Sequence, residues 1–226
     1  MAAAPDGPPK TPDAPDAPPL GVVLRPLLPL FVIDILTAFT VGMVPPLLPL
    51  LAEEWQLSPL QVGLVNTLYA FGRLGTAYPA SALRARQGTR ALVGLGLLLL
   101  VLGVVGCGVA RGFPTFLAAR LVMGIGASAA FLAIFAELLE ATPGLWRGRL
   151  TNAFESVSIL SLGIGSTLGA WAAGQAGWRW VFLGTGPIVL LSWVAWRALD
   201  PEAGRQVLGL AAAGHAERHP AHRRLL

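Results

Sequence analysis

The chain has 226 residues and a net charge of +4, and 54% of its residues are hydrophobic while only 12% are charged. Charged residues make up about a quarter of an ordinary soluble domain, so this composition excludes that class and indicates a protein that crosses a membrane several times. The basic residues form short clusters between apolar runs without interleaved aromatics, which argues against a nucleic-acid partner.

In chain order, the Pro/Ala/Asp-rich residues 1–24 are expected to form a disordered cytoplasmic tail. Six apolar segments follow, each close to the roughly 20 residues that span a bilayer as a helix. They are residues 27–51, 59–83, 91–110, 114–136, 153–173 and 178–197, and only the connection 137–152 is long. The sequence therefore predicts an all-α membrane protein, with a bundle over 25–198 and a basic cytoplasmic tail over 199–226.

The distribution of lysine and arginine predicts the orientation of these segments. Cytoplasmic connections are enriched in basic residues, and a cytoplasmic N-terminus leaves only Arg111 and Arg179 outside. The residues then inside are Lys10, Arg25, Arg84, Arg86, Arg90, Arg147, Arg149, Arg197, Arg205, Arg218, Arg223 and Arg224. We expect a multi-pass protein of the plasma membrane with both termini in the cytoplasm.

The cytoplasmic turn between the second and third segments carries a motif. Its sequence, LRARQGTR over residues 83–90, resembles the loop of the major facilitator superfamily with the pattern G-x-L-x-D-R-x-G-R-R. Leu83, Arg86, Gly88 and Arg90 match this pattern. The family has Gly, Asp and Arg where this chain has Ser81, Ala85 and Thr89.

Further stretches resemble the same family in the same order. Arg120, Gly124 and Gly126 match its fourth-helix motif R-x-x-x-G-x-G, and residues 177–187 are similar to the start of its sixth helix. The resemblance covers roughly residues 25–200. It implies the N-terminal six-helix half of a transporter, built as two inverted three-helix repeats. It also implies a small-molecule substrate, a proton or other coupling ion, and a second six-helix half or a homodimer as partner.

Charged residues inside the spans are candidates for substrate binding and proton coupling, because such residues are costly in a membrane and face a partner or a wet cavity. Asp34, Arg73 and Arg120 are these candidates. The first and fourth helices, which carry Asp34 and Arg120, line the cavity in the family. The alternative is a structural pair in which Asp34 and Arg73 neutralise each other between adjacent helices.

The arginine turn is a candidate for conformational gating. In the family an acidic residue at the end of the fourth helix pairs with an arginine of this loop. The resemblance therefore implies that Glu137 pairs with Arg86 or Arg90 beside Gly88, in place of the missing Asp at position 85. The alternative is that Glu137 and Glu140 are simply solvated carboxylates.

Four glycines are expected at close helix contacts: Gly124, Gly126, Gly165 and Gly169. The last two lie where antiporters of the family carry G-P-x-x-G-G. The proline of that motif is absent here, so we interpret this stretch as a packing face rather than an antiport signature.

No enzyme is predicted, because the sequence lacks G-x-S-x-G, P-loop and H-E-x-x-H motifs. No cofactor or metal is expected either, since one cysteine and three tail histidines without acidic partners make a poor ligand set. The predicted function is transport of a small solute across the bilayer, driven by an ion gradient. The alternative is a truncated membrane protein that does not transport, or one that packs against another transporter.

Overall fold

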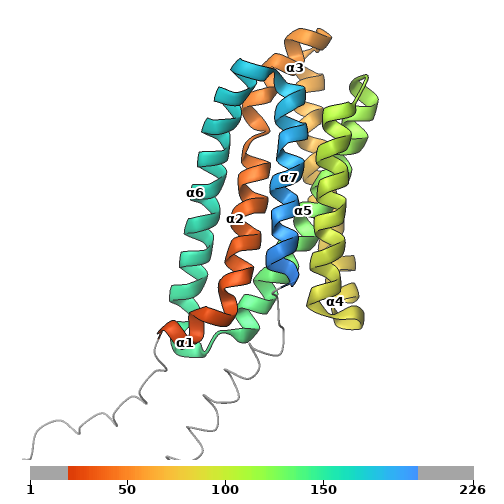
Figure 1. The fold of residues 1–226 in the computed structure, drawn as a ribbon. Helices are drawn as coiled ribbons and strands as arrows, with labels where there is room; N and C mark the ends of the chain where they lie inside the picture. Colours follow the sequence, from red (N-terminus) through yellow and green to blue (C-terminus); the bar gives the residue numbers. More distant parts are fainter. Residues whose placement is uncertain (1–19, 198–226) are drawn as a thin grey trace, which may run out of the picture.

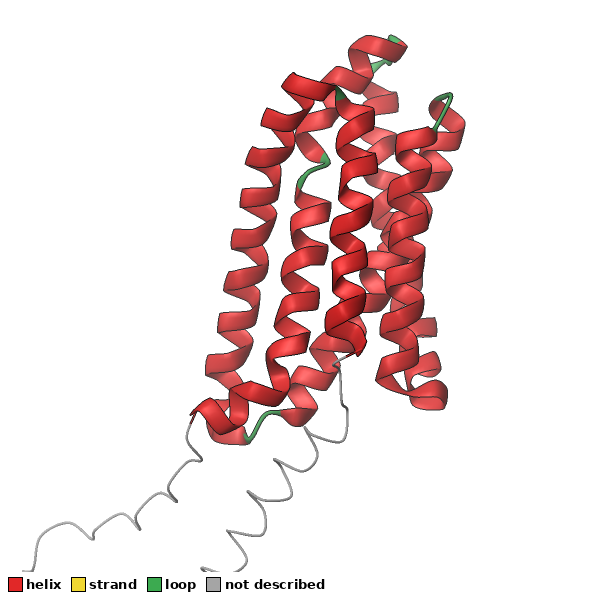
Figure 2. Ribbon diagram, in the orientation of Figure 1, coloured by secondary structure: helices red, strands yellow, loops and turns green. Residues whose placement is uncertain are grey.

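The computed structural model describes residues 20–197, and this part of the chain is helical with short turns (Figures 1 and 2). Its elements are α1 (Leu20–Leu24), η1 (Arg25–Leu27), α2 (Leu28–Gly42), η2 (Pro45–Leu47), α3 (Leu48–Trp55), α4 (Pro59–Val109), α5 (Phe113–Ala141), α6 (Gly144–Ala176) and α7 (Trp178–Arg197). The prediction of an all-α protein is confirmed for the described residues. Expectations for residues 1–19 and 198–226, including the tail histidines, lie outside them.

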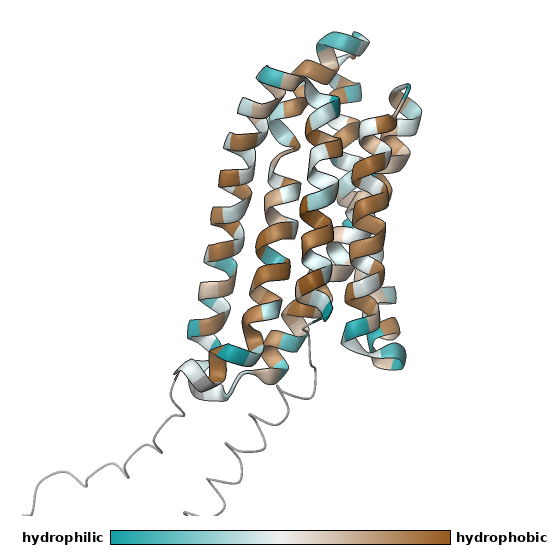
Figure 3. Ribbon diagram, viewed as in Figure 1, coloured by the Kyte–Doolittle hydropathy of each residue, from teal (hydrophilic) through white to brown (hydrophobic). Residues whose placement is uncertain are grey.

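Five helical stretches in the described part are long and apolar enough to cross a membrane. They are Arg25–Trp55, Pro59–Val109, Phe113–Ala141, Trp146–Ala176 and Trp178–Arg197. Apolar residues cover most of their length, and hydrophilic residues gather at the two ends of the bundle (Figure 3). This distribution fits a bundle whose middle lies in hydrocarbon and whose ends lie in water.

Helix α4 reverses direction at Gly88, which has a φ of 84° and a ψ of 166°. This φ favours glycine, because a side chain is strained there. Figure 1 shows the chain turning back at the lower end of α4. We call residues 59–87 the first arm and residues 89–109 the second arm. The expected segments 59–83 and 91–110 fall in these two arms.

Both arms of α4 pack against α5 through small residues. In the first arm, a Cβ added to Gly72 would lie 2.5 Å from the Leu121 carbonyl oxygen. In the second arm, a Cβ added to Gly103 would lie 2.5 Å from the Met123 nitrogen. Helix α5 therefore lies between the two arms and fixes their spacing.

The expected long connection over residues 137–152 is wrong. Helix α5 continues to Ala141 and α6 begins at Gly144, so the helices are separated only by Thr142 and Pro143. Pro143 is the N-cap residue of α6 and has an extended backbone conformation. The Thr142 hydroxyl donates to the Leu138 carbonyl within the last turn of α5. The charged residues of this region lie on helix ends that extend beyond the apolar part.

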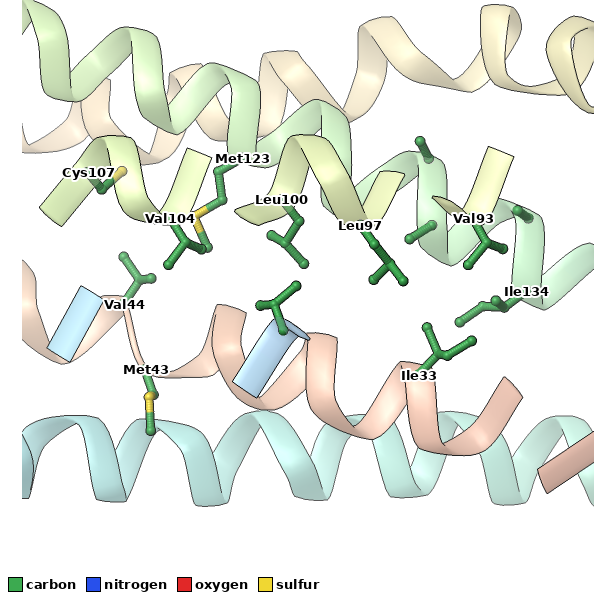
Figure 4. Close-up of a cluster of buried hydrophobic side chains, with 14 of the residues drawn as sticks. Ile33, Met43, Val44, Val93, Leu97, Leu100, Val104, Cys107, Met123 and Ile134 are labelled. Carbon is green, nitrogen blue, oxygen red and sulfur yellow. The ribbon is translucent and has the colours of Figure 1, made fainter. Parts of the chain in front are cut away.

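The first span is interrupted between α2 and α3. Pro45 and Pro46 have no backbone N–H, so the carbonyls of Val41 and Gly42 lack their usual helical donors. Val41 instead accepts from the Val44 nitrogen at 3.3 Å. Figure 4 shows Met43 and Val44 at this interruption, beside a core that α4 and α5 complete with Val104 and Met123.

Helices α2 and α6 run parallel, as three contacts show. The rings of Phe31 and Phe154 lie 5.3 Å apart between centroids. Further along both helices, Gly165 packs against the backbone of Phe39, and Gly169 packs against that of Met43. Residue numbers increase in the same direction along both helices, and facing residues differ by 123 to 126 in number. Asp34 of α2 therefore faces the part of α6 around Ser158.

Contacts between distant residues define the two ends of the bundle. At one end, Arg84 binds carboxylates at the end of α5, and the Trp196 indole donates to the Arg90 carbonyl at 2.8 Å. At the other end, Arg179 donates to the Ala110 carbonyl at 2.7 Å, and its side chain reaches Glu54 at 3.2 Å. Arg179 therefore lies at the opposite end from Arg84 and Arg90.

An aromatic cluster closes the end that carries Arg179. Trp55 of α3 meets Phe116 of α5 edge to face at 5.7 Å, and it meets Trp178 of α7 at 5.4 Å. The Trp178 indole also donates to the Glu54 carboxylate. Edge-to-face aromatic pairs of this kind add to the burial of the rings, so α3 is fixed to α5 and α7.

Candidate functional site

Asp34 is a buried carboxyl group in the middle of α2. Its side chain is 2% exposed, and its Oδ2 atom has no hydrogen-bond partner among the described residues. The neighbouring Thr37 hydroxyl donates to backbone carbonyls and not to the carboxyl group, which makes a side-chain hydrogen bond with Ser158. The polar groups that face Asp34 are Ser158 and Glu155 of α6.

Arg120 is buried in α5 against the first arm of α4. Its side chain is 3% exposed, and its Nη1 and Nη2 atoms lie 3.3 Å from Met123 Sδ and 3.4 Å from Asn66 Oδ1. The guanidinium carbon lies 4.6 Å from the centre of the Tyr69 ring. Within the described chain its Nε atom has no partner. The cation is thus held by a ring face, a sulfur atom and an amide, which carry no negative charge.

Arg73 lies on the first arm of α4, and its side chain is exposed. Its backbone carbonyl accepts from the Ser128 hydroxyl of α5 at 3.1 Å. In the part of the chain that the structure describes, no ion pair joins Asp34 to Arg73 or to Arg120. The groups that act on Asp34 are instead on α6.

A polar network joins the turn at Gly88 to the end of α5. The guanidinium group of Arg84 donates two hydrogen bonds of 2.7 Å to the Glu140 carboxylate and one of 3.3 Å to Glu137. The Thr89 hydroxyl accepts from Arg84 Nε at 3.0 Å and donates to Glu137 at 2.6 Å. A cavity of about 530 Å³ adjoins this network and is also lined by Gly88. We call Arg84, Thr89, Glu137 and Glu140 the turn network.

The structure differs here from the expected pairing of Glu137 with Arg86 or Arg90. Arg84 faces α5 just before the reversal at Gly88 and is the arginine that binds Glu137. Arg86 is exposed. The guanidinium of Arg90 lies 5.2 Å from the centre of the Trp196 ring on α7. The positive φ at Gly88 redirects the chain, and Arg90 beyond it packs on Trp196 while Arg84 before it binds Glu137.

The four glycines singled out in the sequence lie at close backbone contacts. A Cβ added to Gly124 would meet the Tyr69 carbonyl oxygen, and one added to Gly126 would meet the Leu100 nitrogen. In α6, Gly165 and Gly169 lie against α2 in the same way. These contacts are closer than a side chain allows.

Sequence reasoning missed several residues of these sites. Arg84 lies inside the recognised motif, but at a position for which the motif specifies no residue type. Asn66 and Tyr69 precede Arg73 by seven and four residues, so a helical projection would have placed all three on one face. Ser158 carried no signal, because its importance depends on the register between α2 and α6.

Comparison with known proteins shows which proteins this chain resembles in sequence. The chain is 29% identical over 142 residues to an uncharacterized MFS-type transporter, YhcA, of Bacillus subtilis, a match that covers 62% of this chain and 26% of that protein. It is 27% identical to Multidrug resistance protein 3 of the same organism, covering 61% of this chain and 25% of the relative. It is 28% identical to a Glucose transport protein of Synechocystis, and this match covers 81% of this chain and 41% of that protein.

The chain thus spans less than half the length of each of these relatives. The family model described as Major Facilitator Superfamily matches residues 30–225, which is well over half of the chain. Together with the bundle of long apolar helices, this match establishes that the chain belongs to the Major Facilitator Superfamily.

Proposed function

We propose that this chain forms half of a membrane transporter for a small solute and couples transport to protons through Asp34. The observation that carries the proposal is the burial of this carboxyl group without a partner for Oδ2 in the described residues. Family membership supports transport in general, and three relatives are named for transport or drug resistance.

Asp34 suits proton exchange because its two charge states differ greatly in cost. An ionised carboxylate in the middle of a span costs at least about 2.5–3.5 kcal/mol, whereas the neutral acid costs much less. The side chain has no counter-ion in the described chain that would hold it permanently charged. Water that reaches it in one conformation can therefore take its proton, and closure of the site favours its return.

The two arms of α4 complete a six-helix half. With each arm counted as one crossing, the five apolar stretches give six, and we infer two inverted repeats of three helices. On this reading α2 and α5 occupy equivalent positions, which are the positions of Asp34 and Arg120. The clustering of basic residues near the Gly88 end supports a cytoplasmic location for both termini in the plasma membrane.

The turn network supplies the gating element of this proposal. Arg84 binds two carboxylates across separate helices, so a movement of α5 relative to the turn breaks charged hydrogen bonds. Such bonds bias a conformational equilibrium. Arg86, Gly88, Arg90 and Glu137 contribute through the geometry of the turn and its polar surface.

The exposed side of the first arm supports a second half or a second copy as partner. It carries Asn66 and Arg73, both exposed, among large apolar residues such as Phe71 and Leu74. Amide and guanidinium groups in the middle of a span are costly against lipid. A protein surface or an aqueous cavity on this side removes that cost.

Proton-coupled flux in liposomes tests the function. The whole chain is reconstituted with a pH dye inside, and glucose, benzenesulfonate and ethidium are added outside in turn. We expect at least one solute to drive proton movement, and Asp34→Asn to abolish that movement. Glu53→Gln, which alters an exposed carboxylate of α3, is the matched control and keeps the movement.

The amide of Asp34→Asn preserves the shape of the side chain but cannot exchange a proton. Membrane insertion and helical content should therefore be unchanged. Proton movement that persists in Asp34→Asn excludes Asp34 as the coupling group. A wild-type chain that moves neither protons nor solute, either as a homodimer or together with a second six-helix half, contradicts the proposed transport.

A further inference from the structure

Two arginines from different helices flank Tyr69 on the first arm of α4. Asn66, Tyr69 and Arg73 are spaced by three and four residues and therefore share one face of this arm. Arg120 of α5 packs on Asn66 and Tyr69, with Nη2 3.4 Å from Asn66 Oδ1 and its guanidinium carbon 4.6 Å from the Tyr69 ring centre. The charges of Arg73 and Arg120 both act on Tyr69. We call these four residues the arginine stripe.

The arginine stripe carries two positive charges and no negative one. The acidic side chains of the described residues lie elsewhere, either between α2 and α6 or at the ends of helices. These are Asp34, Glu53, Glu54, Glu137, Glu140 and Glu155. Arg120 is 3% exposed and its Nε has no partner in this part of the chain. A buried cation without a counter-ion is costly, so the site favours an anion.

The stripe lies too deep for a lipid headgroup to supply this anion. Arg73 is 14 residues from the start of α4 and 15 from Gly88, so about 20 Å of helix separates it from either end. The hydrocarbon core is about 30 Å thick, which puts Arg73 near its middle. Its exposed side chain is costly against lipid tails, so it requires a protein surface or water beside it.

We propose that Arg73 and Arg120, with Asn66 and Tyr69, bind the anionic group of the transported solute. Two guanidinium groups offer planar, paired donors that match a carboxylate, sulfonate or phosphate. The Asn66 amide and the Tyr69 hydroxyl add neutral donors beside them. This inference rests on the proposed transport function and assigns it a substrate class, a small organic anion.

Binding to the whole chain in mild detergent tests the stripe without any gradient. The probes are benzoate and phenyl phosphate, with benzamide as the neutral analogue of benzoate. The readout is the unfolding temperature, reported by reaction of a thiol dye with Cys107, which is fully buried in the fold. We expect at least one anion to raise this temperature saturably and benzamide to have no effect.

Substitution of the stripe then weakens anion binding. We expect Arg73→Gln and Arg120→Gln each to lower the affinity for the anion about tenfold, a typical effect for a charged hydrogen bond. Arg111→Gln removes an exposed arginine outside the stripe and leaves the affinity unchanged. Because Arg73 is exposed, Arg73→Gln keeps the test valid even if Arg120→Gln does not fold.

Three outcomes would overturn the inference: equal affinity for benzoate and benzamide, no saturable binding of either anion, or unchanged anion affinity in Arg73→Gln. The flux experiment remains separate. Anion binding that depends on Arg73 supports the stripe even if liposomes show no flux. Flux by a chain that binds no anion overturns the substrate class and leaves the proposed transport intact.

Discussion

Gly169 offers the sharpest test of the packing between α2 and α6. A Cβ added there would lie 2.7 Å from the Met43 carbonyl oxygen and 2.8 Å from Met43 Cα, whereas ordinary contact begins at 3.4 Å. These atoms are backbone, so Gly169→Ala must move the two helices apart by about 0.7 Å. Overpacking of this kind costs typically about 1–3 kcal/mol.

Gly163 provides a matched control on the same helix, because a Cβ added there has nothing within 4 Å. Alanine is a better helix former than glycine by up to about 1 kcal/mol, and both variants receive this gain. The difference between Gly169→Ala and Gly163→Ala therefore isolates the contact with Met43. At about 2–4 °C per kcal/mol, it corresponds to an unfolding temperature roughly 2–12 °C lower for Gly169→Ala.

The assay is thermal unfolding in mild detergent, followed by reaction of a thiol dye with Cys107, the single cysteine of the chain. Cys107 is fully buried, so it reacts only when the bundle opens. An unfolding temperature of Gly169→Ala that equals or exceeds that of Gly163→Ala would refute the close approach of α2 and α6.

Two further predictions concern the turn at Gly88. In a Cys107→Ser background, Gln87→Cys should resist a membrane-impermeant thiol reagent in intact cells while Gln56→Cys reacts, and the reverse pattern would invert the orientation. Arg84→Gln should destabilise the fold by about 1–2 kcal/mol in the same thermal assay run with Cys107 intact, because it removes charged hydrogen bonds at a partly exposed site. Arg86→Gln should change stability by less than about 0.5 kcal/mol, and a loss equal to that of Arg84→Gln would contradict the network.

The spans were predictable because burial in lipid requires a continuous apolar run, which is visible in the order of residues along the chain. Helix ends were not, because a helix can continue past its apolar part, as α5 does from Glu137 to Ala141. The region around Thr142 and Pro143 therefore looked like a long connection when it is a tight one.

The charged residues of the candidate sites were predictable from the sequence, but the residues that contact them were not. Asp34 and Arg120 were found because ionisable groups inside a span are conspicuous. Their neighbours depend on which way each helix faces, and one apolar sequence fits several rotations of a helix. The same limit explains why Arg84 was passed over for Arg86, since the direction of the chain at Gly88 decides which arginine meets α5.

The interruption of the first span has a mechanical consequence. Between Met43 and Pro46 the ladder of backbone hydrogen bonds is incomplete, so the span bends more easily there than within α2 or α3. Above this point α3 is tied by Trp55 to α5 and α7, and below it α2 is packed along α6. A displacement of one group of helices is therefore absorbed as a change of angle at this joint, and the segment that carries Asp34 can keep its alignment with α6.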